Sequence, residues 1–180
     1  VLAMLLSAVS KSRRASLRNP AALKQILASG AAPLPHLSAF EQGAGLLDPH
    51  ATEEALREFS PHVSVFPPRL DLTPDGCPWM WPYCAQPLYA SSQPLLLNLT
   101  LLSSISPRAA FAAPPVWTPR ANRRMLQVDF AYGDGMRAYA GHFGLRLRVP
   151  AEASSFEGEV EGEITLSFSD FVNNDGSTSA

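Results

Sequence analysis

Apolar residues recur at helical spacing in the first sixty residues of the chain. Leu23, Ile26 and Leu27 fall on one face of a helix. Asn19-Pro20 is a typical helix start, because Asn caps free backbone N–H groups and Pro lacks the N–H that the first turn leaves unpaired. Gly30 suits the position just after a helix, where a left-handed backbone is common. The pattern therefore predicts a helix that begins at Asn19-Pro20 and ends before Gly30.

Two further helical segments flank this one. Residues 51–59 form a second amphipathic helix, with Glu53 and Glu54 near the positive end of its dipole. Residues 1–9 are apolar but too short to span a bilayer. We interpret them as the end of a buried helix, because the basic residues of a signal peptide would precede the apolar run rather than follow it. Residues 11–18 hold four basic residues and are expected to form a solvated loop.

After Ser60-Pro61 apolar and polar residues alternate with a period of two. The clearest case has Phe143 and Leu145 on one face and Arg146 on the other. Short alternating segments between Gly and Pro turns are typical of an antiparallel sandwich. The segments expected to be strands are 63–66, 70–73, 95–102, 125–132, 143–149 and 160–168.

Together these patterns predict an α+β chain with a boundary near residue 60. Residues 1–60 form a helical unit, residues 61–172 an antiparallel β-sandwich, and residues 173–180 a polar tail or linker.

Composition supports a folded chain and points away from nucleic acid. Hydrophobic residues make up 46% of the 180 residues and charged residues 17%, which permits a packed core. The 17 prolines favour edges, turns and irregular connections over a helical bundle. A net charge of −2 gives no reason to expect a nucleic-acid partner.

Cys77 and Cys84 form an isolated pair in one short segment. Such a pair is either a disulfide or half of a metal site. No CxxC or HxxxH motif follows to complete a zinc ligand set, so no metal is expected and a disulfide is favoured. A disulfide implies an oxidising compartment. The sequon Asn98-Leu99-Thr100 marks Asn98 as a glycosylation candidate and points to the same secretory lumen.

The four histidines provide no complete hydrolytic site. A triad requires a His, an orienting carboxylate and a nucleophile. His50 beside Asp48 is the nearest candidate, and the others are His36, His62 and His142. No G-x-S-x-G motif is present, so we interpret the His50 pair as a surface turn.

Three other patterns also favour structural roles. Cys77 lies too close to Cys84 to remain a free nucleophile. Asp129 and Asp134 match no calcium-loop spacing and are expected to be solvated. Gly43-Ala44-Gly45 fails the phosphate-loop pattern, because Asp48 stands where a third glycine is needed, so a turn is expected.

The aromatic segment between the two cysteines is the least ordinary part of the sequence. Trp79, Trp81 and Tyr83 share an eight-residue ring with two prolines. These side chains can form an exposed recognition surface, or they can fill a seam between the helical and β parts. The seam is favoured, because exposed tryptophans are costly without a partner.

At this segment the chain resembles the site-1 protease family of membrane-bound, subtilisin-like enzymes. The most specific match is CPWMWPYCAQPLY. NPAALKQILASGA and FEQGAGLLD resemble the last part of that family's subtilase domain, and VSVFPPRLDLTPDGCPWMWPYC resembles the junction after it. QPLLLNLTLL resembles a strand in which the family also carries a sequon, and GHFGLRLRVPAEASSFEGEVEGEITLSF resembles a later stretch. Residues 103–124 match poorly, which suggests a remodelled connection.

The resemblance implies a longer serine endopeptidase of which this chain is one part. Residues 1–60 would be the C-terminal end of its subtilase domain, with the nucleophilic Ser upstream of Val1 and no catalytic residue in the chain. The longer enzyme would cleave membrane-anchored protein precursors in the Golgi or endoplasmic reticulum, with any membrane anchor outside this chain. Calcium is a candidate cofactor of the longer enzyme, and none is assigned to this chain. The partners would be the upstream protease domain and protein substrates. The alternative is a non-enzymatic secreted sandwich that binds a protein through its Trp-rich loop.

Overall fold

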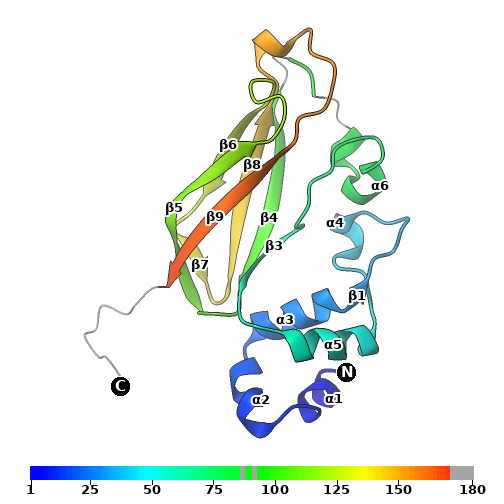
Figure 1. Cartoon of the computed structure of the whole chain (residues 1–180), viewed down its shortest axis with the longest axis vertical. Helices are drawn as coiled ribbons and strands as arrows, with labels where there is room; N and C mark the ends of the chain where they lie inside the picture. The colour runs from blue at the N-terminus through cyan, green and yellow to red at the C-terminus, as the bar shows by residue number, and fades with distance from the viewer. Residues whose placement is uncertain (86–87, 91–92, 171–180) are drawn as a thin grey trace, which may run out of the picture.

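The computed structural model of the chain describes residues 1–85, 88–90 and 93–170. Helices dominate the first part of the chain and gather at one end of the molecule, and an antiparallel sheet extends away from them (Figure 1). The α+β fold class that the sequence predicts is therefore confirmed. The elements of the first part are α1 (Leu2–Ser7), α2 (Lys11–Leu17), α3 (Pro20–Ser29), β1 (Ala31–Ala32), α4 (Ala39–Gln42), β2 (Leu46–Leu47) and α5 (Pro49–Glu58).

The two longest helices begin at side-chain caps. Asn19 caps α3, because its Oδ1 accepts a hydrogen bond from the N–H of Ala21 at 2.9 Å. Asp48 caps α5 through the N–H of His50 at 2.8 Å. The start predicted for α3 is confirmed, and α5 begins at Pro49, two residues earlier than predicted.

Gly30 ends α3 for a reason that the sequence does not show. Its φ is −92°, so the left-handed backbone expected there is absent. A Cβ on Gly30 would lie 2.3 Å from the Cα of Thr52 in α5. The glycine therefore allows α3 and α5 to approach closely. Gly45, in contrast, has a φ of +112°, and it makes the tight turn that we predicted.

The prediction of a loop over residues 11–18 is wrong, because this segment contains helix α2. Arg13 Nη2 donates to the carbonyl of Leu56 at 2.7 Å, near the end of α5. Arg14 Nε donates to the carbonyl of Val9 at 3.0 Å, just after α1. These arginines satisfy carbonyls that helix ends leave without a partner, so α2 is held by contacts that charge patterning does not reveal.

The apolar segment at residues 1–9 is helical, as predicted, but most of it is not buried. Leu5 is the buried residue of α1, at 3% exposure. Val1 and Met4 are 53% and 56% exposed. Within this chain, the description as the end of a buried helix holds for one residue of α1.

A curled antiparallel sheet forms the second part of the fold. In sheet order the strands are β3, β4, β8, β7, β5 and β9, and β6 pairs with β8. Short β7 joins the β4–β8 half to the β5–β9 half, and the two halves pack on each other as in a sandwich (Figure 1). The bounds are β3 (Val63–Phe66), α6 (Cys77–Met80), the 3₁₀ turn η1 (Tyr83–Ala85), β4 (Leu95–Ser103), β5 (Arg108–Pro119), β6 (Gln127–Tyr132), β7 (Gly135–Arg137), β8 (Ala140–Arg148), the 3₁₀ turn η2 (Ala151–Ala153) and β9 (Gly162–Asp170).

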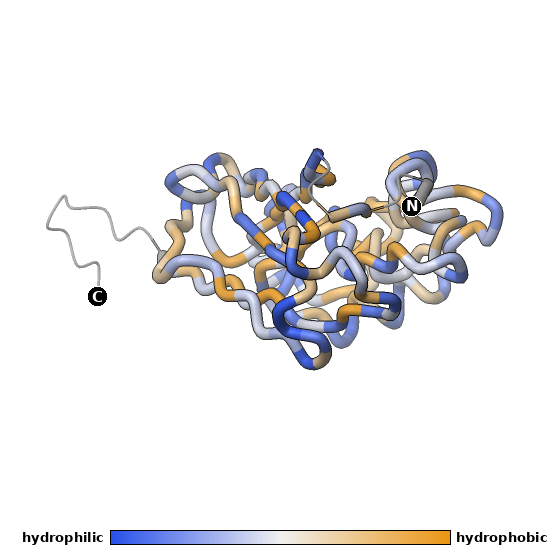
Figure 2. The backbone as a smooth tube through the Cα atoms, turned by 90° about the horizontal axis from the view of Figure 1, so that it is seen from above, coloured by the Kyte–Doolittle hydropathy of each residue, from blue (hydrophilic) through white to orange (hydrophobic). Residues whose placement is uncertain are grey.

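The core of the sheet follows the period-two pattern of the sequence. Along β4 buried leucines alternate with exposed residues, which include Leu96. Figure 2 shows apolar and polar residues interspersed along the backbone. Phe111 of β5 contacts the other half, with ring centroids 4.7 Å from Tyr132 of β6 and 6.3 Å from Phe143 of β8. Within its own half, it lies 4.8 Å from Phe168 of β9. The buried core residues are Met80, Leu95, Leu97, Leu99, Leu101, Ala109, Met136, Phe143, Leu145 and Leu147.

The prediction of a strand at residues 70–73 is wrong, and strands β5 and β7 of the larger sheet were not predicted. Residues 70–73 form a turn, in which Asp71 Oδ1 accepts from the N–H of Thr73 at 3.2 Å and from its hydroxyl at 2.6 Å. Strand β5 lies where no strand is predicted. Its register shifts twice between Phe111 and Val116, which accommodates prolines that cannot donate to a ladder.

The helical part and the sheet meet close to the predicted boundary at residue 60. Helix α5 ends at Glu58 and strand β3 begins at Val63. The division into two domains stays a prediction. The predicted tail at 173–180 lies outside the described residues.

Candidate functional site

Polar contacts join α3 to the sheet in what we call the seam: Asn19 and Gln25 on the helix, with His62, Ser64, Leu102 and Ser104 on the β side. Asn19 Nδ2 donates to the carbonyl of Ser104 at 2.8 Å. Gln25 Nε2 lies 3.1 Å from the carbonyls of both His62 and Leu102 and 2.9 Å from the hydroxyl of Ser64. One helix is thereby bound to both β3 and β4.

Gln25 is buried at 4% exposure, and among the described residues its Oε1 has no hydrogen-bond partner. Sequence analysis did not single out this residue. The available signal was a polar side chain between Ala22 and Ile26, which are also buried. A buried amide at such a position requires partners from elsewhere in the chain.

The structure contains a disulfide between Cys77 and Cys84, with Cα atoms 5.1 Å apart. The segment between them is a short helical turn, α6, followed by η1, rather than a hairpin. Met80, at the end of α6, is 0% exposed and belongs to the core of the sheet. The disulfide loop is therefore held on the sheet by Met80, which lies in the middle of the loop.

The aromatic side chains of this loop divide into two groups. Trp79 and Tyr83 are partly buried and pack against the core of the sheet. Tyr83 also meets Phe40 of α4 edge-on, with centroids 4.8 Å apart, so it bridges the helical and β parts. Trp81 is 52% exposed. The loop therefore both fills the junction and presents one tryptophan at the surface.

An open groove of about 510 Å³ lies between the helical part and the disulfide loop. Trp81 lines it together with three apolar neighbours, Leu37, Pro74 and Pro78. Glu41 is an exposed carboxylate in the lining. The remaining lining residues are His36, Ser38 and Cys77.

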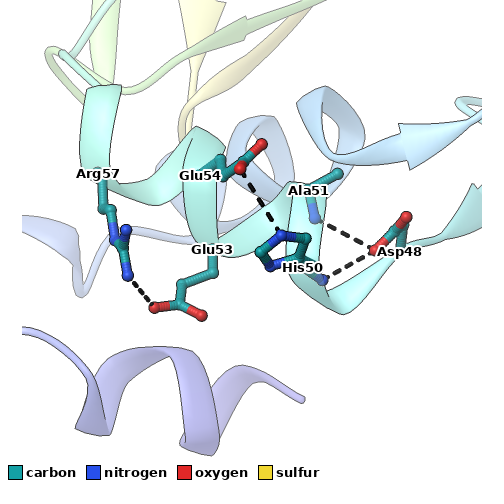
Figure 3. A network of polar contacts seen from close by, with 6 residues as sticks. All are labelled: Asp48, His50, Ala51, Glu53, Glu54 and Arg57. Atoms are coloured by element: carbon teal, nitrogen blue, oxygen red, sulfur yellow. Dashed lines mark hydrogen bonds and ion pairs between the residues drawn. The ribbon is translucent and has the colours of Figure 1, made fainter.

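His50 and Asp48 serve helix α5 rather than catalysis. Asp48 Oδ1 accepts the N–H groups of His50 and Ala51, as an N-cap does (Figure 3). His50 Nε2 lies 3.7 Å from Glu54 Oε1, one helical turn away. The imidazole thus faces its own helix, as a surface-turn interpretation predicts.

The other histidines lie on separate elements. His36 lines the groove, and His142 is exposed on β8. His62 Nδ1 lies 2.9 Å from the carbonyl of Ser60. The structure therefore does not bring the candidate histidines together into one site.

The acidic candidates do not fit calcium. Asp129 accepts from Gln127 Nε2 at 3.1 Å, and Asp134 lies 3.8 Å from Arg137 Nη2. Over residues 1–85, 88–90 and 93–170, no three His, Cys, Asp or Glu side chains gather as a metal site would require.

Asn98 is exposed near the middle of β4. The residue paired with it on β8 is Gly144, and Ala131 of β6 follows in the same row. This outer face beside Asn98 carries small residues, which leaves space around the amide. The geometry leaves room for a modification at this position.

The pKa of Asp71 lies below the ordinary value of an aspartate. The hydrogen bond from the Thr73 hydroxyl is the largest cause of the lowered pKa of Asp71, and the Arg69 guanidinium contributes to it. The charged form of Asp71 therefore holds the turn that leads into the disulfide loop.

Among the described residues, no helix has the length and apolar character needed to cross a membrane.

Residues 66–179 match the family model described as "MBTPS1, third Ig-like domain". Among curated proteins, the chain is 37% identical over 168 residues to "Subtilisin-like protease SBT6.1" of Arabidopsis thaliana, covering 92% of this chain and 16% of that protein. It is 34% identical over 160 residues to "Membrane-bound transcription factor site-1 protease" of Mus musculus and of Homo sapiens, covering 88% of this chain and 15% of each relative. The chain thus spans about a sixth of the length of these proteins.

Proposed function

This chain belongs to the site-1 protease family of subtilisin-like proteases, and we propose that it is a non-catalytic scaffold within a longer serine endopeptidase. In this proposal the nucleophilic Ser precedes Val1, and the longer enzyme hydrolyses peptide bonds by Ser-His-Asp acyl transfer. Its substrates are membrane-anchored precursors in the Golgi or endoplasmic reticulum, and any membrane anchor lies outside this chain. The helices close the protease domain, and the sandwich braces it.

The seam is the observation that carries the scaffold role. Gln25 binds two strands from a buried position, and Asn19 both caps α3 and binds Ser104. Directional bonds to buried carbonyls hold one helix orientation, whereas apolar contact alone is less specific. A protease domain that ends in these helices would therefore be held at a defined angle to the sandwich.

Exposed apolar residues on the helical part support a contact with an upstream protease domain. Leu46 is 65% exposed on β2, and Leu34 and Leu47 are 37% and 36% exposed. Met4 and Val1 of the first segment are also more than half exposed. Exposed apolar residues such as Leu46 and Leu47 of β2 are typical of a surface that packs against another domain.

The lumenal assignment rests on the disulfide and the exposed sequon. A disulfide between Cys77 and Cys84 persists in an oxidising compartment, and glycosylation at Asn98 requires the same lumen.

Labelling with a fluorophosphonate probe tests the proposal. The 180-residue chain is expected to show no labelled serine, because it has no triad to activate one. A longer product of the same gene, extended upstream, is expected to label at a Gly-Thr-Ser serine. Labelling of the short chain, or absence of an upstream Gly-Thr-Ser in frame, would contradict the proposal.

A second candidate function is binding of a protein partner through the Trp-rich loop. The 52% exposure of Trp81 favours it, because a large aromatic side chain at the surface beside a groove is typical of binding sites.

A further inference from the structure

The groove beside Trp81 is polarised in a way that selects its occupant. Its apolar lining comes from Trp81, Pro74, Pro78 and Leu37, and Glu41 contributes a carboxylate. Neither Lys nor Arg occurs among the eight lining residues. The groove therefore offers an apolar wall and a negative charge side by side.

Glu41 retains capacity to bind a ligand. Its Oε2 accepts the N–H of Ser38 at 3.0 Å, which fixes the carboxylate at the groove. Among the described residues, Oε1 accepts no hydrogen bond and no cation pairs with this side chain. A carboxylate held by one oxygen and free at the other can accept a guanidinium N–H.

The neighbouring charges keep the groove negative. Asp75 follows Pro74 in the turn at the groove and is exposed. The nearest basic residue in sequence, Arg69, is already paired with Asp71. Charge complementarity therefore favours a cation.

We propose that this groove binds an arginine side chain presented by an extended segment of a protein partner. The methylene stem packs on Pro74, Pro78 and Leu37, the guanidinium stacks on Trp81, and Glu41 accepts its N–H groups. Phe40, next to Glu41 in α4 and 38% exposed, offers apolar surface for a residue that flanks the arginine. This inference rests on the second candidate function and is independent of the scaffold role.

The test uses the 180-residue chain and the pentapeptide acetyl-Gly-Leu-Arg-Leu-Gly-amide. Its analogues carry citrulline, which is neutral and isosteric with arginine, or norleucine, which is apolar. Binding is followed by NMR through the indole N–H of Trp81, with those of Trp79 and Trp117 as internal references. We expect the arginine peptide to move the Trp81 signal and to bind about threefold or more tightly than the citrulline peptide.

Two variants separate the contributions of ring and charge. Glu41→Gln keeps an acceptor for Ser38 and is expected to reduce the arginine-to-citrulline ratio to about one. Trp81→Ala is expected to abolish binding of all three peptides. Matched controls on exposed positions elsewhere, Glu157→Gln and Leu96→Ala, are expected to leave binding unchanged.

Several outcomes would overturn the inference. They are no shift of the Trp81 signal at 10 mM peptide, equal binding of the arginine and citrulline peptides, or norleucine binding as tight as arginine. Retention of the arginine preference in folded Glu41→Gln would do so as well. Failure here leaves the scaffold proposal intact, because fluorophosphonate labelling does not depend on the groove.

Discussion

Replacing Gln25 with leucine removes the central contact of the seam while keeping a side chain of similar size. The substitution eliminates the amide that binds the carbonyls of His62 and Leu102, at 3.1 Å each. It also removes Oε1, which is buried without a partner. The two effects oppose each other, so their magnitudes decide the outcome.

The loss is the larger effect. Leaving an acceptor unsatisfied costs about 1–3 kcal/mol, and a lost hydrogen bond whose acceptor keeps another donor costs less. The His62 carbonyl keeps the Ser104 N–H and hydroxyl as donors, whereas the Leu102 carbonyl and the Ser64 hydroxyl lose the Gln25 amide. Removing the unpaired Oε1 and burying a leucine recovers about 1–3 kcal/mol. We expect Gln25→Leu to lower the free energy of unfolding by about 1 kcal/mol, which corresponds to about 2–4 °C in Tm for a chain of this size.

Gln25→Glu is expected to destabilise more, by about 3–5 kcal/mol, because it places a carboxylate against carbonyl oxygens at a buried position. Burial raises the pKa of such a carboxyl, so this deficit should shrink as the pH falls toward about 4 and the group becomes neutral. The loss of stability in Gln25→Leu is not expected to change with pH, because leucine does not titrate.

Urea unfolding followed by tryptophan fluorescence measures all three proteins. Lys24→Leu, at an exposed position of the same helix, is the control and should change stability by less than about 0.5 kcal/mol. A Gln25→Leu protein within about 0.5 kcal/mol of the unsubstituted chain would refute the argument that the seam contributes to stability.

Three further predictions concern the disulfide, the sequon and the turn. Protein from a secretory host, digested without reduction, should yield Cys77 and Cys84 in one cross-linked peptide, and alkylatable thiols would contradict this. Closing this eight-residue ring should stabilise the folded chain by about 2.5 kcal/mol or less. The same protein should lose apparent mass on glycosidase treatment, and Asn98→Gln should abolish that shift, whereas an unchanged mass would remove Asn98 as a site. Because the folded pKa of Asp71 is lowered, its contribution is present above its ordinary value of 3.8 and is lost as the pH falls through the lowered value. Asp71→Asn should therefore flatten the acid limb of stability below about pH 4 in pH-dependent urea unfolding, and an unchanged limb would argue against it.

Local signals in the sequence predicted several elements correctly. The start of α3 at Asn19-Pro20 depends only on nearby residues, because the Asn19 cap accepts N–H groups from the first turn of the same helix. Period-two alternation predicted that Phe143 and Leu145 of β8 share a face opposite Arg146, because strand geometry alone places alternate side chains on one face. The disulfide loop was equally visible, because its two cysteines lie close together in the sequence.

Tertiary structure decided what depends on distant partners. Helix α2 is held by Arg13, which binds Leu56 of α5, 43 residues away, and by Arg14, which binds Val9. Strand β5 exists because β9 and β7 supply its ladder, while register shifts accommodate prolines that disfavour a strand locally. Composition does not distinguish Trp79 from Trp81. In the structure Trp79 packs against the core of the sheet, whereas Trp81 stays exposed at the groove. Capping and strand periodicity act within a few residues, whereas burial depends on what the rest of the chain brings alongside. Local sequence therefore determined where α3 starts and how β8 faces the core, and the fold determined which side chains are free to bind.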